Sequence, residues 1–204
     1  MLDSMQMMRA IEWYDANAEE RSCTYSAMDP VRINGWWSEL KPPAPALAVD
    51  IGAGSGRDAG WLAEMGHPVI AVEPSPGMRR QALLQGHSPQ ITWLDDQLPE
   101  LQQMRGRQIK AQLVLVSAVW MHLPHSQRPA AMHALASIMA PGSLLVMTVR
   151  QGPAEAERLM HRIDANEVAD LGTTAGLQIA RRIRTKDQMQ RQAIAWDCLA
   201  FRKH

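Results

Sequence analysis

The chain has 204 residues, of which 46% are hydrophobic and 21% are charged, a composition typical of one soluble globular domain. Its 21 basic and 21 acidic residues cancel to a formal net charge of zero, so no overall charge attracts the protein to nucleic acid or to anionic membranes. It has no apolar run long enough to span a membrane, and its two distant cysteines form neither a disulfide framework nor a zinc pattern, so we expect a cytoplasmic protein without metal.

The first part of the chain, residues 1–43, is polar with scattered aromatic residues, and it predicts one or two helices. A stiff proline-rich segment, KPPAPA at residues 41–46, separates it from a more regular region. We therefore expect a helical lid over residues 1–43 and a main domain over residues 44–204, together forming one structural domain.

In the main domain, apolar runs of strand length alternate with helical patterns. The predicted strands cover residues 46–51, 68–73, 90–94, 112–120, 143–149, 177–185 and 193–202, and the predicted helices cover 56–66, 75–86, 126–140 and 166–176. This alternation predicts an α/β fold with a mostly parallel sheet. Only the seven residues KDQMQRQ join the last two strands, and a parallel pair needs a longer crossover, so this pair should be antiparallel.

A glycine-rich loop, DIGAGSGRD at residues 50–58, follows the first predicted strand and precedes a helix. Three glycines in five positions leave backbone N–H groups and a helix N-terminus open at one point, which favours binding of the polar parts of a nucleotide. The spacing is G-x-G-x-G, not the G-x-G-x-x-G that is typical of sites for dinucleotides. The loop therefore predicts a nucleotide-like cofactor other than a nicotinamide or flavin dinucleotide.

Carboxylates follow the next two strands. Glu73 ends the second strand about 20 residues beyond the glycines, a place suited to accept hydrogen bonds from ribose hydroxyls. After the third strand, LDDQLP offers Asp95, our first choice, and Asp96, our second, to accept from an adenine amine. Either aspartate could instead be only a turn residue.

Five segments in register resemble the class I S-adenosylmethionine-dependent methyltransferases: VDIGAGSGRD, VIAVEPS, ITWLDDQLP, LVLVSAVWMHLP and LASIMAPGSLLVMTVR. The resemblance covers roughly residues 44–150, and WYDANAEE in the N-terminal part is similar to the small-molecule enzymes of the ubiquinone/menaquinone and tellurite-resistance type. It implies a Rossmann-like sheet of seven strands with helices on both faces, the last strand antiparallel, and a helical lid.

The resemblance also implies the cofactor, S-adenosyl-L-methionine, which leaves as S-adenosyl-L-homocysteine. Ser117 matches a position whose backbone touches the methionyl amine, and Arg57 either reaches the cofactor carboxylate or is a solvated residue of the helix start. The implied cofactor-binding residues are Asp50, Gly52, Ala53, Gly54, Gly56, Arg57, Glu73, Pro74, Asp95, Asp96 and Ser117.

Methyl transfer to a small acceptor needs chiefly that donor and acceptor are held close and aligned. His122 is the candidate base, although a histidine at such a place more often holds its loop by a hydrogen bond. Candidate residues of the acceptor pocket are Tyr14, Tyr25, Trp120 and Arg150, although Trp120 is more typical of a core residue and Arg150 could equally be a surface charge.

Three other functions stay open at this point. The chain could methylate RNA or protein, because residues 181–192 contain five basic residues against one acid, although a solvated strand end explains this run better. It could hold the cofactor without turnover, or be a nicotinamide oxidoreductase, which the glycine spacing disfavours. As partners we expect a small-molecule substrate and neither nucleic acid nor membrane, in a monomer or a homodimer.

Overall fold

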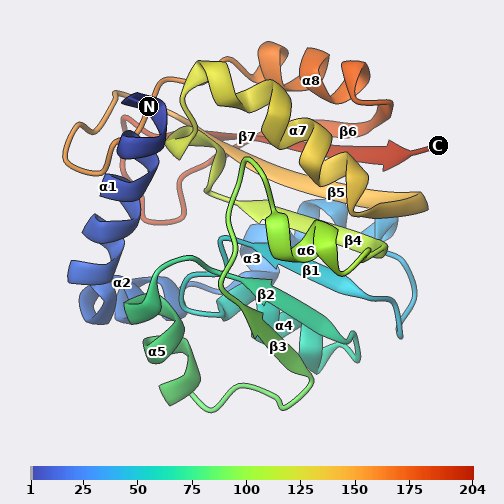
Figure 1. The fold of residues 1–204 in the computed structure, drawn as a ribbon, viewed down its shortest axis with the longest axis horizontal. Helices are drawn as coiled ribbons and strands as arrows, with labels where there is room; N and C mark the ends of the chain where they lie inside the picture. Colours follow the sequence, from blue (N-terminus) through green and yellow to red (C-terminus); the bar gives the residue numbers. More distant parts are fainter. Residues whose placement is uncertain (1) are drawn as a thin grey trace.

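Seven strands form one twisted sheet in the order β3-β2-β1-β4-β5-β7-β6 in a computed structural model that describes residues 2–204 (Figure 1). Met1, the first residue of the predicted lid, lies outside the described residues. The strands are β1 (Ala48–Ile51), β2 (Val69–Val72), β3 (Ile91–Leu94), β4 (Ala111–Ser117), β5 (Met139–Gln151), β6 (Leu177–Lys186) and β7 (Ala195–Lys203).

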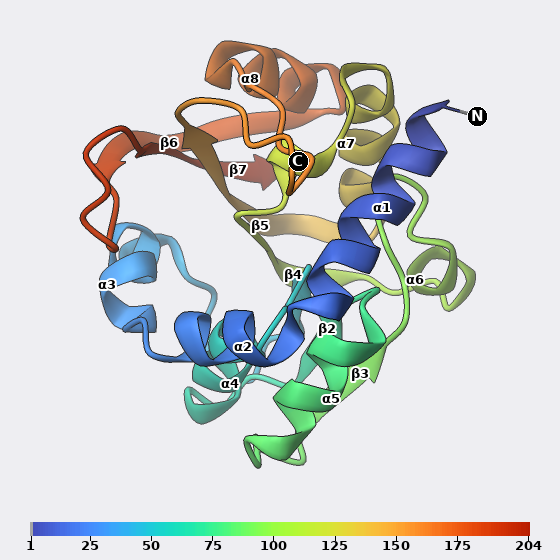
Figure 2. The ribbon, with the colours of Figure 1, turned by 90° about the vertical axis from the view of Figure 1, so that its left-hand side faces the viewer.

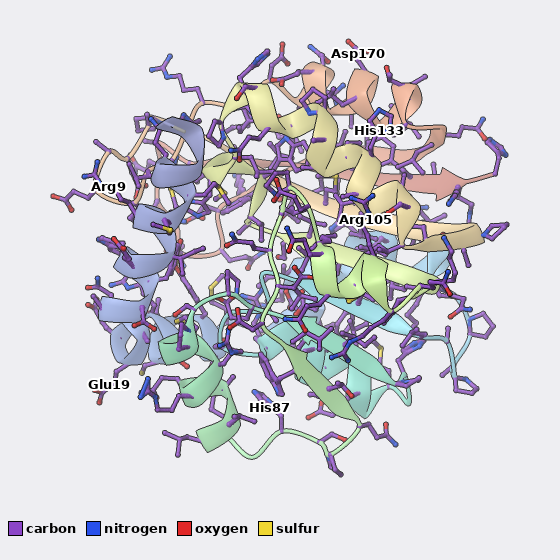
Figure 3. All side chains as sticks on the ribbon, in the orientation of Figure 1. Arg9, Glu19, His87, Arg105, His133 and Asp170 are labelled. Atoms are coloured by element: carbon purple, nitrogen blue, oxygen red, sulfur yellow. The ribbon has the colours of Figure 1, made fainter. Side chains whose placement is uncertain are left out.

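Helices follow most of these strands. They are α1 (Leu2–Ala16), α2 (Ala18–Ser26), α3 (Pro30–Asn34), α4 (Arg57–Glu64), α5 (Pro76–Leu84), α6 (Gln102–Gly106), α7 (Arg128–Ser137) and α8 (Ala165–Thr174). Short 3₁₀ helices cover Gly35–Leu40, Trp120–His122 and His125–Gln127. Exposed charged residues lie at the periphery, among them Arg9, Glu19, Arg105, His133 and Asp170 (Figure 3).

The direction of the strands confirms the predicted sheet. From β3 to β5, neighbouring strands are parallel, whereas β7 is antiparallel to both β5 and β6. The short connector between β6 and β7 therefore turns a hairpin, as its length requires. The Rossmann-like fold with a reversed last strand is confirmed.

Both faces of the sheet are buried, which explains why its central strands read as continuous apolar runs. In β1, Val49 and Ile51 pack into a core that includes side chains of α6, α7 and α8. Ala48 belongs to a second core, with Leu62 of α4 and Trp37.

Four details differ from the sequence-based expectation. The predicted strand 112–120 ends at Ser117, because Ala118 has a φ of 58° and turns the chain into a 3₁₀ helix. The short helix α6 was not predicted, and the N-terminal part holds three α-helices instead of one or two. The predicted helix 126–140 ends at Ser137, and β5 already begins at Met139.

The N-terminal helices pack on the main domain through α5. Asp15 of α1 accepts hydrogen bonds from the backbone N–H of Gly77 and from the Ser75 hydroxyl, at the start of α5. Gln85, just past the end of α5, bonds to Ser22 and Ser26 of α2, at 2.8 Å each. As a result, α1 crosses the side of the molecule where the parallel strands end (Figure 2).

Among the described residues, no helix has both the length and the apolar character that crossing a membrane would require.

Candidate active site

A cavity lies where the carboxyl ends of β1, β2, β4 and β5 meet α1 and α2. In an open α/β sheet this edge is where ligands bind. We call its lining residues from 50–98 and 117–119 the glycine-loop wall, and those from 7–28 and 121–196 the arginine wall.

The three glycines of the loop have different reasons to be glycine. All have positive φ, at 69° for Gly52, 55° for Gly54 and 78° for Gly56. A Cβ on Gly52 would lie 2.4 Å from Val119, and one on Gly56 would lie 2.8 Å from the His87 ring. Around Gly54 the nearest such atom is 3.6 Å away. Protein packing thus explains two of the glycines, while Gly54 keeps backbone bare at the cavity.

Glu73 closes the glycine loop from the end of β2. Its two carboxylate oxygens accept hydrogen bonds from the backbone N–H groups of Gly54, at 2.9 Å, and Ser75, at 2.8 Å. Burial raises the pKa of this carboxyl, and the two N–H donors lower it. Glu73 lines the cavity, so the carboxylate expected to meet ribose hydroxyls lies at the cavity wall.

Asp50 is a buried carboxylate at the end of β1. One of its oxygens has no hydrogen-bond partner among the described residues. Burial raises the pKa of this carboxyl well above its usual value, and the neighbouring charges of Asp58 and Glu73 raise it further. Such a group favours a cationic or hydrogen-donating ligand, because the ligand would stabilise the ionised form.

Arg57 lines the cavity and is held by its neighbour in the chain. Its Nε and Nη2 donate to the two carboxylate oxygens of Asp58, at 2.9 and 2.6 Å, and Asn34 also donates to that carboxylate. Arg57 is therefore a partly buried member of an ion pair, and the expectation of a solvated arginine is wrong. Its reach toward a cofactor carboxylate stays a prediction.

Of the two aspartates after β3, the second choice, Asp96, lines the cavity, and the first choice, Asp95, does not. Asp95 is exposed, pairs with Arg79 at 3.0 Å and does not line the cavity. Asp96 is buried at the cavity and accepts from the backbone N–H groups of Gln97 and Met104. Asp96 is therefore the better candidate for the cofactor, because the side chain of Asp95 points to solvent and pairs there with Arg79 of α5.

The other predicted site residues also divide into those that line the cavity and those that do not. The glycine-loop wall contains Ala53, Pro74 and Ser117. Gly56 packs against His87 outside the cavity lining, and Trp120 is fully buried in the core, so neither lines the cavity. Trp120 cannot contact an acceptor there, because the turn at Ala118 directs it inward.

His122 lies in the arginine wall, bonded at both ring nitrogens. Nδ1 is 3.1 Å from the carbonyl oxygen of Arg158, which can only accept, so Nδ1 carries the proton. Nε2 then accepts from the Tyr14 hydroxyl at 3.2 Å. Burial is the main cause that lowers the pKa of His122 to about 4, and the positive charge of Arg158 contributes to this shift. His122 is therefore neutral at physiological pH, with its lone pair directed at Tyr14.

Arg158, which sequence reasoning missed, connects α1 and α2 to this network. Its Nη2 donates to the hydroxyls of Tyr14 in α1, at 2.8 Å, and Tyr25 in α2, at 3.0 Å. Its guanidinium also lies 5.4 Å from the centre of the Trp13 ring. Burial is the main cause that raises the pKa of Tyr14.

Arg150 ends β5 inside the same wall and shares one carboxylate with Arg158. Glu155 accepts from Arg150 with one oxygen and from Arg158 with the other. Arg191 and Trp196 also line this wall, and both donate to Asp187. Tyr14, Tyr25 and Arg150 thus lie together at the cavity, as expected.

Comparison with known proteins identifies the domain that builds the glycine-loop wall. Residues 48–142 match a family model described as a methyltransferase domain. This region of the chain is therefore similar to a methyltransferase domain. No curated protein sequence matches it significantly.

Solved structures share the fold of this chain at low sequence identity. The 1,6-didemethyltoxoflavin-N1-methyltransferase of Burkholderia thailandensis, solved with 1,6-didemethyltoxoflavin and S-adenosylhomocysteine, is 18% identical, with a TM-score of 0.78 over 98% of this chain and 90% of that one. Magnesium protoporphyrin IX methyltransferase of Synechocystis PCC 6803, with bound S-adenosylhomocysteine, is 14% identical, with a TM-score of 0.75 over 98% and 100%. A TehB-like S-adenosylmethionine-dependent methyltransferase of Corynebacterium glutamicum is 16% identical, with a TM-score of 0.68 over 95% and 98%.

No group of three or more histidine, cysteine, aspartate and glutamate side chains that could hold a metal ion occurs among the described residues. The missed residues with polar contacts in the arginine wall lie outside the matched region. Arg158, Arg191 and Trp196 come from the chain after β5, where no motif marks them. The sequence shows more basic than acidic residues in 181–192, but this charge pattern does not predict that Arg191 lines a cavity.

Proposed function

We propose that this methyltransferase transfers a methyl group from S-adenosylmethionine to a small-molecule acceptor. The observation that carries the proposal is the cavity that joins bare glycine backbone and Glu73 to Tyr14, Tyr25 and Arg158. One ligand can therefore lie in the glycine-loop wall while a second, small ligand meets it from under α1 and α2.

The glycine-loop wall fits S-adenosylmethionine in its chemistry. Gly54 leaves space for the ligand, and Glu73 offers acceptors to ribose hydroxyls. The unpartnered oxygen of Asp50 suits the methionyl amine, and we assign Asp96, which lines the cavity after β3, to the adenine amine. Ala53, Pro74, Ser117 and Arg57 complete the proposed binding residues, and Asp95 is left out.

When bound, the cofactor supplies an electrophilic methyl carbon; its bond to sulfur breaks as the acceptor bonds to carbon, and the electron pair stays on sulfur. The chain's own task is to hold acceptor and donor in line and to exclude water. Because Arg158 joins α1, α2 and the segment after β5 through Tyr14 and Tyr25, it keeps the acceptor side closed.

A proton released by the acceptor has a path through two side chains. Tyr14 can take it while passing its own proton to Nε2 of His122. A histidine with a pKa of about 4 is a weak base, which suffices where methylation makes the acceptor strongly acidic. His122 thus acts through Tyr14 in this proposal.

The alternative acceptors are less well supported. Four of the five basic residues in 181–192 are engaged within the chain: Arg181 with Glu39, Arg182 with Asn166, Arg184 with Asp197 and Arg191 with Asp187. These contacts disfavour a phosphate-binding surface. A cytoplasmic location, consistent with the free thiols of Cys23 and Cys198, belongs to the proposal as well.

Calorimetric titration with S-adenosylmethionine, S-adenosylhomocysteine and NADH tests the proposal. We expect micromolar binding of the two adenosyl-sulfur ligands and none of NADH, followed by methyl transfer in a screen of small metabolites. Binding of NADH alone would refute the proposal. Binding of the cofactor without transfer to any small acceptor, but with transfer to RNA or protein, would replace the acceptor class.

A further inference from the structure

Charge is unevenly distributed around the cavity. The carboxylates that line it, Asp50, Asp58, Glu73 and Asp96, all belong to the glycine-loop wall. The guanidiniums of Arg21, Arg150, Arg158 and Arg191 line the arginine wall, which has no lining carboxylate among the described residues. The lining carboxylates and these four guanidiniums therefore belong to different walls of one cavity, while the remaining lining guanidinium, Arg57, pairs with Asp58 in the glycine-loop wall.

The arginine wall has more positive charge than its own acids neutralise. Arg150 and Arg158 are largely buried, with side-chain exposures of 4% and 15%, and they share the single carboxylate of Glu155. Buried charge is costly unless it is paired, so two guanidiniums on one carboxylate leave a positive charge without compensation. Burial lowers the pKa of Arg150, and repulsion from Arg191 and Arg158 lowers it further.

The same two side chains also have unused donors. The Nε atoms of Arg150 and Arg158 are buried, and neither has a hydrogen-bond partner among the described residues. Their other nitrogens are occupied by Glu155, by the two tyrosines and by the carbonyl oxygen of Pro153. Spare charge and spare N–H groups occur together on these two guanidiniums.

The surroundings describe the rest of the ligand. Apolar side chains flank the arginines in the arginine wall, namely Met121, Met160, Met189 and Trp196. Guanidinium groups bind carboxylates through planar, charge-assisted hydrogen bonds. One uncompensated charge matches a monoanion better than a doubly charged phosphate ester.

We infer that the methyl acceptor is a small apolar or aromatic carboxylic acid whose carboxylate binds beside Arg150 and Arg158. This inference rests on the proposed function and specifies its substrate class. The carboxylate is the group by which the acceptor is recognised, and the rim of the glycine-loop wall receives the opposite end of the molecule.

Titration of the full chain with benzoate, benzamide and phenyl phosphate, with and without S-adenosylhomocysteine, tests the inference. We expect benzoate to bind at least tenfold more tightly than the neutral, isosteric benzamide. Arg158→Gln should weaken benzoate binding tenfold or more, with binding of S-adenosylhomocysteine unchanged. Arg182→Gln, the same substitution at an exposed arginine outside the cavity, should leave both affinities unchanged.

A second variant works in the opposite direction and does not depend on the folding of the first. Glu155→Gln removes the acid that competes for the two guanidiniums, so benzoate should bind at least threefold more tightly. Equal binding of benzoate and benzamide, tighter binding of phenyl phosphate, or no gain in Glu155→Gln would overturn the inference. Loss of S-adenosylhomocysteine binding in the unmodified protein would instead refute the proposed function.

Discussion

The hydroxyl of Tyr14 lies 3.2 Å from Nε2 of His122, so the first helix meets a turn 108 residues further along the chain. The carbonyl oxygen of Arg158 accepts from the other nitrogen of the same ring, and the side chain of Arg158 donates to Tyr14. The three residues form a closed set of hydrogen bonds across α1, the Trp120–His122 turn and the segment after β5.

Removing the hydroxyl of Tyr14 or of Tyr25 should distinguish two roles of these residues, namely closing the acceptor side of the cavity and transferring a proton to His122. Tyr14→Phe loses the bond to His122 and one bond to Arg158, whereas Tyr25→Phe loses only a bond to Arg158. We expect turnover to fall at least tenfold more in Tyr14→Phe than in Tyr25→Phe, with binding of S-adenosylhomocysteine unchanged in both. Equal losses in single-turnover assays would show that Tyr14 serves closure alone.

The low pKa of His122 makes folding stability depend on pH. The usual pKa of a histidine is 6.5 and that of His122 in the folded protein is about 4, so the unfolded chain binds more protons between these values and stability falls as pH is lowered through them. From pH 8 to pH 5 the loss should be about 2 kcal/mol, at about 1.36 kcal/mol per pH unit. Urea unfolding of His122→Gln should show this part of the pH dependence removed.

His133→Gln, at an exposed histidine of α7, is the control and should keep the pH dependence of the unmodified protein. If His122→Gln also kept it, the source would be another group. His122→Gln should bind S-adenosylhomocysteine with the affinity of the unmodified protein.

Filling the glycine loop should abolish cofactor binding. Gly54→Val places a side chain at the cavity, in a residue with a φ of 55°. Gly86→Val is a matched control, because Gly86 has a φ of 69° and open space but lies after α5, outside the cavity lining. Both variants should lose about 1–2 kcal/mol of stability through backbone strain. Only Gly54→Val should lose more than 100-fold in affinity for S-adenosylhomocysteine by calorimetry.

The two carboxylates after β2 and β3 can be compared by isosteric replacement. Glu73→Gln should weaken binding of S-adenosylhomocysteine by roughly tenfold or more, because a charge-assisted acceptor at the ribose is lost. Asp95→Asn should have no effect, since Asp95 is exposed outside the cavity. The reverse order of effects would restore Asp95 as the cofactor residue and remove Glu73.

Asp50 should show a conflict between stability and binding. Its raised pKa means that the folded protein holds a proton which the unfolded chain releases, so stability falls as pH rises above the usual value of 3.8. Asp50→Asn should therefore be more stable than the unmodified protein at pH 8 and no different at pH 4. It should also bind S-adenosylhomocysteine more weakly. Asp170→Asn, exposed on α8, should change neither property.

Local sequence signals predicted the glycine-loop wall well, because its parts are consecutive in the chain. The strands at 46–51 and 68–73, Gly54 and Glu73 could be found from apolar runs and glycine spacing alone. The order of Asp95 and Asp96 could not, because it depends on which of two adjacent side chains faces α5. The predicted end of β4 was wrong for a similar local reason, because the positive φ of Ala118 ends the strand at Ser117.

Some residues of the arginine wall were predicted, among them Tyr14 and Tyr25, but the part played by Arg158 was not, because its contacts join distant segments. Arg158 meets Tyr14 and Tyr25 across 144 and 133 residues. A lone arginine in a polar connection has no periodicity or motif that indicates burial. Arg150 was found only because it ends a recognisable strand.

The two walls of the cavity come from separate stretches of the polypeptide, 50–98 with 117–119 on one side and 7–28 with 121–196 on the other. Exchanging the N-terminal helices and the connections after β5 would therefore leave Gly54, Glu73 and Asp50 in place. Replacing only the N-terminal helices and the connections after β5 could therefore change which acceptors are methylated. The residues proposed to bind S-adenosylmethionine would stay the same.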